Sequence, residues 1–241
     1  MQIINYDILL RLLVAHLIGD FILQPKDWVE KRNENVLKSF HIYVHCIIHG
    51  ILAYVLLFNF SSFAIPVIIT ISHFFIDFIK IRFIKEKKFS FIFDQVLHIS
   101  VIIIIWVVAS NQCNQIYNNI SLNLINVHIW MILLAYLLVL KPTSLLIFEF
   151  TKKWESEIKV ESLVDAGRWI GYLERILILT FILKGYYQAI GFLLAAKSIF
   201  RFGDLKGDNN IKLTEYVLIG TLASFVIAII AGVILKKFLL F

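Results

Sequence analysis

Long stretches with almost no charge constrain this chain more than any other feature of its sequence. The run 216–235, for example, contains no Asp, Glu, Lys or Arg. About 20 apolar residues in a helix cross the ~30 Å hydrocarbon core of a bilayer. Only 17% of the residues are charged and 60% are hydrophobic, whereas about a quarter of the residues in a soluble domain are charged. The sequence therefore predicts an all-α, polytopic membrane protein rather than a soluble bundle.

The apolar stretches predict a membrane bundle of about eight transmembrane helices. Their expected bounds are 7–23, 39–58, 63–83, 91–109, 127–140, 169–183, 187–202 and 213–235. Pro142 is expected to end or kink the fifth helix, because proline removes a backbone donor. We expect three parts: a four-helix half with a polar core (1–110), a middle part (111–166) and a three-helix half (167–241). The middle part combines an uncharged loop, the fifth helix and an amphipathic cytoplasmic connector.

The distribution of Lys and Arg predicts the orientation of the chain. Most of these residues fall in the loops that follow the first, third, fifth and seventh predicted helices. Cytoplasmic loops carry such an excess, so we expect a multi-pass protein of the bacterial inner membrane with both termini outside. Lys236 and Lys237 fall on the side of the membrane opposite to the other loop cations. An odd number of membrane helices would place them on the cytoplasmic side. The net charge of +6 is explained by these loops, and we expect no nucleic-acid partner.

Polar residues gather in the predicted helices of the first half. The second helix carries three histidines four residues apart, His41, His45 and His49. Three other helices each carry a histidine and an aspartate at the same spacing: His16 and Asp20, His73 and Asp77, Asp94 and His98. Residues four apart lie on one face of a helix, and ionisable side chains inside a membrane are rare and costly.

The predicted orientation also matches these residues in depth. His16, His49, His73 and His98 fall near the middle of the membrane. Asp20, His41, Asp77 and Asp94 fall nearer the cytoplasmic end. The order of histidine and aspartate reverses in the fourth helix, as antiparallel helices require if the layers are to match.

Imidazoles and carboxylates together are ligands for Zn²⁺, Mn²⁺ or Fe²⁺. We expect the metal ligands to be His16, His41, His45, His49, His73, Asp77 and His98. Asp20 and Asp94 are the expected catalytic groups, acting as general base where they do not bind the metal. Gln24, Gln95 and Lys80 are expected to hold the ligands in place by hydrogen bonds. The leading interpretation is a metal site that faces the cytoplasm and hydrolyses a membrane-associated substrate.

Two other functions fit the same pattern. The histidines and aspartates could relay protons or pass a metal ion across the bilayer, although the outer halves of these helices are apolar. Alternatively, the polar groups could form a hydrogen-bonded core that only sets the fold. In that case, the charged loops would dock a soluble cytoplasmic protein.

The second half carries a separate set of charged residues. They are Arg168, Glu174, Arg175, Lys197, Arg201 and Glu215. Such cations could form a pocket for an anion or a lipid phosphate near the cytoplasmic face. The alternative, which we favour, is that ion pairs lock three helices together.

These motifs resemble a bacterial integral membrane family called domain of unknown function 3307. The resemblance rests on Ala15-His-Leu-Ile-Gly-Asp-Phe-Ile-Leu-Gln24, the histidines of the second helix, Ser72-His-Phe-Phe-Ile-Asp77 with Lys80, and Asp94-Gln-Val-Leu-His98. It covers about 9–108, and the run 167–175 with two later motifs resembles longer members. The family name implies no function. A more distant likeness to membrane-bound metal-dependent hydrolases agrees with the leading interpretation.

Overall fold

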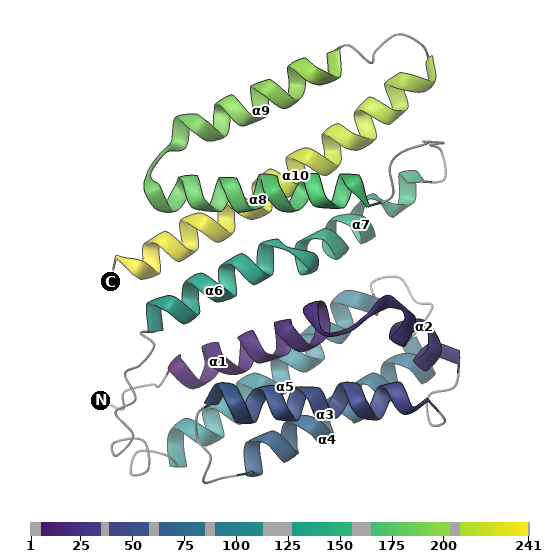
Figure 1. Ribbon diagram of the computed structural model, residues 1–241, viewed down its shortest axis with the longest axis vertical. Helices are drawn as coiled ribbons and strands as arrows, with labels where there is room; N and C mark the ends of the chain where they lie inside the picture. The colour runs from purple at the N-terminus through teal and green to yellow at the C-terminus, as the bar shows by residue number, and fades with distance from the viewer. Residues whose placement is uncertain are drawn as a thin grey trace. The chain divides into compact units, whose positions relative to one another are not determined.

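The computed structural model describes residues 6–34, 39–57, 63–84, 90–112, 127–155, 165–202 and 208–240. These residues form helices and short connections, with no strand among them, so the predicted all-α class is confirmed. The chain divides into two compact units, Met1–Leu134 and Ala135–Phe241, which are described separately. Figure 1 shows the helices of both units.

The first unit is built from four long helices, two of which end in a wider π-helical turn. The elements are α1 (Tyr6–Leu17), η1 (Ile18–Ile22), α2 (Lys26–Glu34), α3 (Phe40–Leu57), α4 (Ala64–Ile79), η2 (Lys80–Ile84), α5 (Ser90–Gln112) and the start of α6 (Val127–Val139). α3 packs along α4, and α1 packs against both α3 and α5. Their apolar core consists of Ile8, Leu12, Ala53, Leu57, Ile69, Ile102 and Ile105.

One face of α3 in this unit is arranged as in a membrane protein, with isoleucines outside and histidines inside. On α3, Ile47 and Ile51 are 52% and 55% exposed, whereas His45 and His49 are only 2% exposed. Burial of apolar surface from water cannot explain such a helix, because its apolar face points outward. A surrounding hydrocarbon phase explains it, since lipid tails solvate isoleucine and the histidines find partners inside.

Among the described residues, five helical stretches are long and apolar enough to cross a membrane. They are Phe40–Leu57, Ala64–Ile84, Ser90–Ala109, Val127–Trp154 and Ile211–Leu239. The predicted count of about eight is not confirmed. α1 and η1 together are shorter than these stretches, and α8 (Ala166–Lys184) carries Arg168, Glu174, Arg175 and Lys184.

The second unit contains the end of α6, α7 (Lys141–Glu155), α8, α9 (Tyr187–Phe202) and α10 (Asp208–Leu239). α8 and α10 form its core through Ile178, Ile182, Phe225 and Ala228. Gly232 allows this close approach, because a Cβ there would collide with Ile182. The predicted connector is helical as far as Glu155, and 156–164 lie outside the described residues, as do 113–126 of the uncharged loop.

Pro142 interrupts the helix between α6 and α7, as predicted. A proline cannot donate to the carbonyl four residues earlier, which here belongs to Leu138. Thr143 Oγ1 donates to that carbonyl instead, at 2.7 Å. The guanidinium of Arg175, on α8, donates through Nε to the carbonyl of Val139 and through Nη2 to the carbonyl of Leu140. Arg175 thus supplies a donor to the carbonyl of Val139, whereas the carbonyl of Leu140 also accepts from the amide of Ser144 at 3.1 Å.

We expect Arg175→Met to destabilise the protein. The carbonyl of Val139 would lose its donor in an environment without water, which costs about 1–3 kcal/mol. Thermal unfolding of the detergent-solubilised protein measures this loss. Arg168→Met is the control, because Arg168 pairs with Asp165 at 2.9 Å in a part-exposed position, and such a pair contributes about 0–1 kcal/mol. Equal melting temperatures for the two variants would contradict the proposed role of Arg175.

Candidate metal centre

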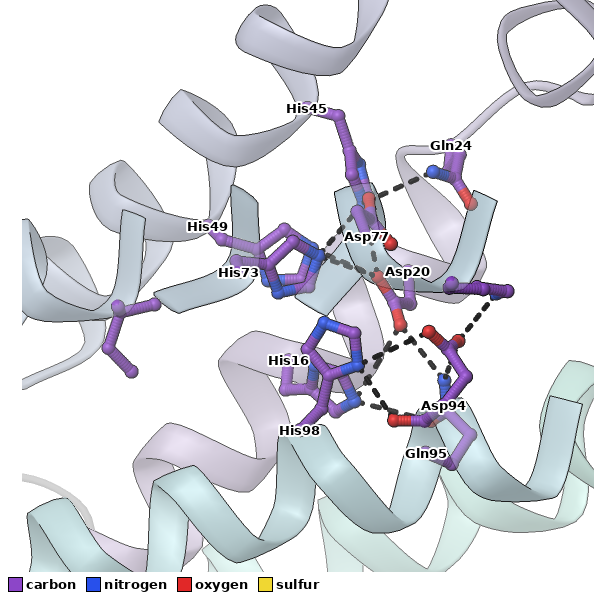
Figure 2. A network of polar contacts seen from close by, with 12 residues as sticks. His16, Asp20, Gln24, His45, His49, His73, Asp77, Asp94, Gln95 and His98 are labelled. Atoms are coloured by element: carbon purple, nitrogen blue, oxygen red, sulfur yellow. Dashed lines mark hydrogen bonds and ion pairs between the residues drawn. The ribbon is translucent and has the colours of Figure 1, made fainter. Parts of the chain in front are cut away.

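Four helices bring their histidines and aspartates together in the first unit (Figure 2). The converging residues are His16 and Asp20 from α1 and η1, His45 and His49 from α3, His73 and Asp77 from α4, and Asp94 and His98 from α5. The rings of His49 and His73 are stacked with their centroids 3.7 Å apart. The ring of His98 lies 4.1 Å from that of His73 and 5.2 Å from that of His16. The four histidines expected at one depth are therefore neighbours.

Asp20 lies at the centre of this cluster. Three histidine Nε2 atoms surround its Oδ1, at 3.1 Å for His49, 3.3 Å for His45 and 3.4 Å for His73. Its Oδ2 lies 3.6 Å from His16 Nε2 and accepts a hydrogen bond from Gln95 Nε2 at 3.1 Å. Each carboxylate oxygen therefore faces a different set of nitrogen atoms (Figure 2).

The local backbone around Asp20 places it at this point. Asp20 belongs to η1, in which the amide of Leu23 donates to the carbonyl of Ile18 at 2.9 Å, a five-residue step. Isolated π-helical turns occur frequently at functional sites. Gly19 precedes Asp20, and a Cβ at this position would collide with the ring of His49. Our sequence analysis missed Gly19, although a glycine beside an aspartate within an apolar helix was a usable signal.

His45 Nε2 has more polar neighbours than a single ring nitrogen can satisfy. It lies 3.0 Å from His73 Nε2, 3.1 Å from Gln24 Nε2 and 3.3 Å from Asp20 Oδ1. A ring nitrogen either donates one hydrogen bond or accepts one. His49 Nε2 makes no hydrogen bond at all, although Asp20 Oδ1 is 3.1 Å away.

A metal ion would resolve this crowding. In a tetrahedral zinc site with bonds of about 2.0–2.1 Å, neighbouring ligand atoms are about 3.3 Å apart. The contacts measured among Asp20 Oδ1 and the Nε2 atoms of His45, His49 and His73 range from 3.0 to 3.4 Å. Four of the six pairs among these atoms therefore have the spacing expected of ligands of one ion.

A second arm of the cluster lies on α5. His98 Nδ1 donates to the backbone carbonyl of Asp94 at 2.9 Å, which leaves the lone pair on Nε2. This Nε2 atom is buried and has no hydrogen-bond partner, and the same holds for Asp94 Oδ1. The other oxygen of Asp94 accepts a hydrogen bond from Lys80 Nζ at 2.6 Å. Of the three expected supporting residues, Lys80 thus contacts Asp94, Gln24 contacts His45 and Gln95 contacts Asp20.

Two of the expected metal ligands differ in their placement. Asp77 is buried, and its Oδ2 lies 3.7 Å from His45 Nε2. His41 is one turn before His45 on α3, outside the cluster: its Nδ1 is 3.2 Å from Ser39 Oγ, and its ring lies 5.6 Å from that of Trp28. The structure therefore does not bring His41 to the other histidines.

A cavity of about 20 Å³ borders the histidines. Its polar walls are His16, His49, His73, His98 and Ser72, and its apolar walls include Leu12, Ala53, Ile69 and Ile102. A volume of about 10–15 Å³ is enough for one water molecule. The cavity can therefore hold a water beside the ring nitrogens.

The charged residues of the second unit do not form one cluster. Lys197 Nζ pairs with Glu174 Oε2 at 2.7 Å, which is an ion pair between α8 and α9. Arg168 pairs with Asp165, and Arg175 contacts the carbonyls described above together with Ser144 and Ser224. Glu215 is exposed. The side chain of Arg201 lies outside the described part of the chain.

The fold and the site define a class: a helical protein with stretches long and apolar enough to span a membrane, which encloses a buried cluster of histidines and aspartates. Residues 8–125 match the model of the family described as protein of unknown function (DUF3307). The resemblance predicted for about 9–108 is thus confirmed. No curated protein and no solved structure matches the chain.

We expect Gly19→Ala to weaken metal binding at this cluster by about tenfold or more, the range seen when supporting contacts of a metal ligand are lost. The added methyl group would displace the ring of His49 from Asp20. Calorimetric titration of the metal-free protein with Zn²⁺ measures the change. Gly220→Ala is the matched control, because nothing lies within 4 Å of its Cβ position. Unchanged affinity in Gly19→Ala would show that the glycine does not position His49.

Proposed function

We propose that this protein binds a catalytic divalent metal ion, Zn²⁺, Mn²⁺ or Fe²⁺, and hydrolyses a membrane-associated substrate. The observation that carries the proposal is the arrangement of three imidazole nitrogens around Asp20 Oδ1 at 3.1–3.4 Å. On the basis of the Lys and Arg distribution and the family resemblance, we place the protein in the bacterial cytoplasmic membrane with both termini outside.

Burial supports a metal ion over a purely hydrogen-bonded core. His45, His49 and His73 are each no more than 3% exposed. Buried polar atoms without partners are costly, yet His49 Nε2 and His98 Nε2 make no hydrogen bond. A structural network would be expected to satisfy these atoms, whereas a metal site needs nitrogens with available lone pairs.

The surroundings of the cluster support hydrolysis. A divalent metal ion lowers the pKa of a bound water and so generates a nucleophile at neutral pH. The cavity beside the rings has room for such a water. In hydrolysis the water oxygen bonds to the electrophilic carbon or phosphorus of the substrate, and its proton passes to the leaving group. Asp94 has a buried oxygen without a hydrogen-bond partner, which could accept this proton in transit.

Two features bear on access to the site. The side chain of Lys80 is 23% exposed and that of Asp20 is 10% exposed, whereas the histidines of the cluster are nearly inaccessible. This end of the bundle is therefore the side from which a substrate would approach. The cavity is also lined by Leu12 and Ile102, which belong to the apolar core of the bundle. An ion crossing the bilayer would have to pass them, which favours an enzyme over a transporter.

Metal analysis of the full-length protein in detergent tests the proposal. We expect the wild-type protein to retain at least one equivalent of metal after loading with Zn²⁺ or Mn²⁺ and gel filtration. His45→Ala and His73→Ala should lose it, because each removes a nitrogen next to Asp20 Oδ1. His41→Ala is the matched control: it removes a histidine of the same helix that lies outside the cluster. A wild-type protein without stoichiometric metal would refute the proposal.

Hydrolysis and transport are separated by a second measurement. We expect the metal-loaded protein to cleave members of a panel of ester, amide and phosphoester lipids, and the metal-stripped protein and His73→Ala not to do so. Metal or proton flux through proteoliposomes, without cleavage of any lipid in the panel, would assign the site to a transporter instead.

A further inference from the structure

The single ion proposed above leaves part of the cluster outside its set of ligands. His98 Nε2 and Asp94 Oδ1 are buried atoms without hydrogen-bond partners, in residues that are each 3% exposed. The backbone contact of His98 Nδ1 fixes the ring so that the lone pair is on Nε2. Lys80 engages only the other oxygen of Asp94. Both free atoms therefore remain available to a ligand.

Asp20 connects these atoms with the first group of histidines. One ligand atom each from Asp20, Asp94 and His98 lies within 4.8 Å of the others, and the same is true of Asp20, His16, His49 and His73. Asp20 is the shared member of the two groups. While its Oδ1 faces His45, His49 and His73, its Oδ2 faces His16 and Gln95. A carboxylate in this position can use one oxygen for each of two ions.

We propose that the cluster holds two divalent metal ions bridged by the carboxylate of Asp20. The first ion is the one already proposed, and this inference rests on that proposal. The second ion binds Asp20 Oδ2, Asp94 Oδ1 and His98 Nε2, and His16 is the nearest further nitrogen ligand. In two-metal hydrolytic sites the ions are about 3.5–4 Å apart and act together on the attacking and leaving oxygens of the reaction.

The charges around the site predict that the two ions bind with unequal affinity. The cluster contains three carboxylates, Asp20, Asp77 and Asp94, and within the described part of the chain Lys80 is a cation 2.6 Å from Asp94. One divalent ion together with Lys80 balances these carboxylates. A second ion adds positive charge close to the first ion, where repulsion is strong, so the second ion should bind more weakly. A hydroxide shared between the ions would reduce this repulsion by its negative charge.

The second ion would change the role of Asp94. As a ligand, its Oδ1 is no longer available as a general base, and the shared hydroxide is itself the nucleophile. His98→Gln and Asp94→Asn then affect metal stoichiometry, which a residue acting only as a base would leave unchanged.

The experiment is a titration of the metal-free, full-length protein in detergent with Mn²⁺, followed by equilibrium dialysis and electron paramagnetic resonance. We expect two Mn²⁺ per chain, the second bound more weakly than the first. The spectrum should change from that of isolated Mn²⁺ to that of an exchange-coupled pair as the second ion binds. Asp94→Asn and His98→Gln should each bind one uncoupled Mn²⁺, and the control His41→Ala should still bind a coupled pair.

Each other outcome has a definite meaning. If wild-type protein binds no metal, both this inference and the proposed function fail. If it binds one ion, which His45→Ala abolishes and Asp94→Asn leaves in place, the proposed function stands and the second ion is refuted. Two ions that are never coupled, or that both persist in Asp94→Asn and His98→Gln, would also refute the bridged pair, because the second ion would then lie elsewhere.

Discussion

The contact between one buried carboxylate and the imidazoles around it is the interaction on which the first unit depends. Asp20 reaches His45, His49 and His73 through one oxygen and His16 through the other, so it joins α1, α3 and α4 at one point. A charge inside a membrane bundle must be compensated locally, because lipid cannot solvate it. Neutral imidazoles offer only one proton each. They satisfy Asp20 in part, and the remaining lone pairs point to a cation.

This requirement also explains how closely the helices approach one another. Gly50 lies where α3 passes α4, and a Cβ there would collide with Thr70 Oγ1. The absence of a side chain lets the two helices lie close enough for the rings of His49 and His73 to stack at 3.7 Å. Gly19 has the same effect for η1 and the ring of His49. Small residues commonly allow such approaches between membrane helices, and here both glycines serve the polar cluster.

Helical spacing was enough to predict most of the cluster, because residues four apart share a face and antiparallel helices reverse their order. Spacing could not predict at which residue a helix stops packing against the other helices of the cluster. His41 shares a face with His45, yet it lies in the first turn of α3, where Ser39 and Trp28 are its contacts. A four-residue pattern also does not indicate a π-helical turn. Such a turn inserts one extra residue into the helix and so changes the direction of the Asp20 side chain. The number of spans was uncertain for a similar reason, since charged helices such as α8 lack a clear apolar signal.

Buried polar groups need hydrogen-bond partners in both units, but the two units differ in how this need is met. In the second unit, Pro142 leaves the carbonyl of Leu138 without its backbone donor, and Thr143 supplies one instead. Arg175 donates to the carbonyl of Val139 beside this break, so the described carbonyls 138–140 have donors. In the first unit, by contrast, His49 Nε2, His98 Nε2 and Asp94 Oδ1 are as deeply buried but lack hydrogen-bond partners. Buried polar groups without hydrogen-bond partners are destabilising in a membrane interior. The second unit shows that this chain can supply such partners, so their absence at these atoms of the first unit needs an explanation. The unpaired atoms are therefore best explained by a ligand, and their chemistry, imidazole nitrogen and carboxylate oxygen, is that of a metal site.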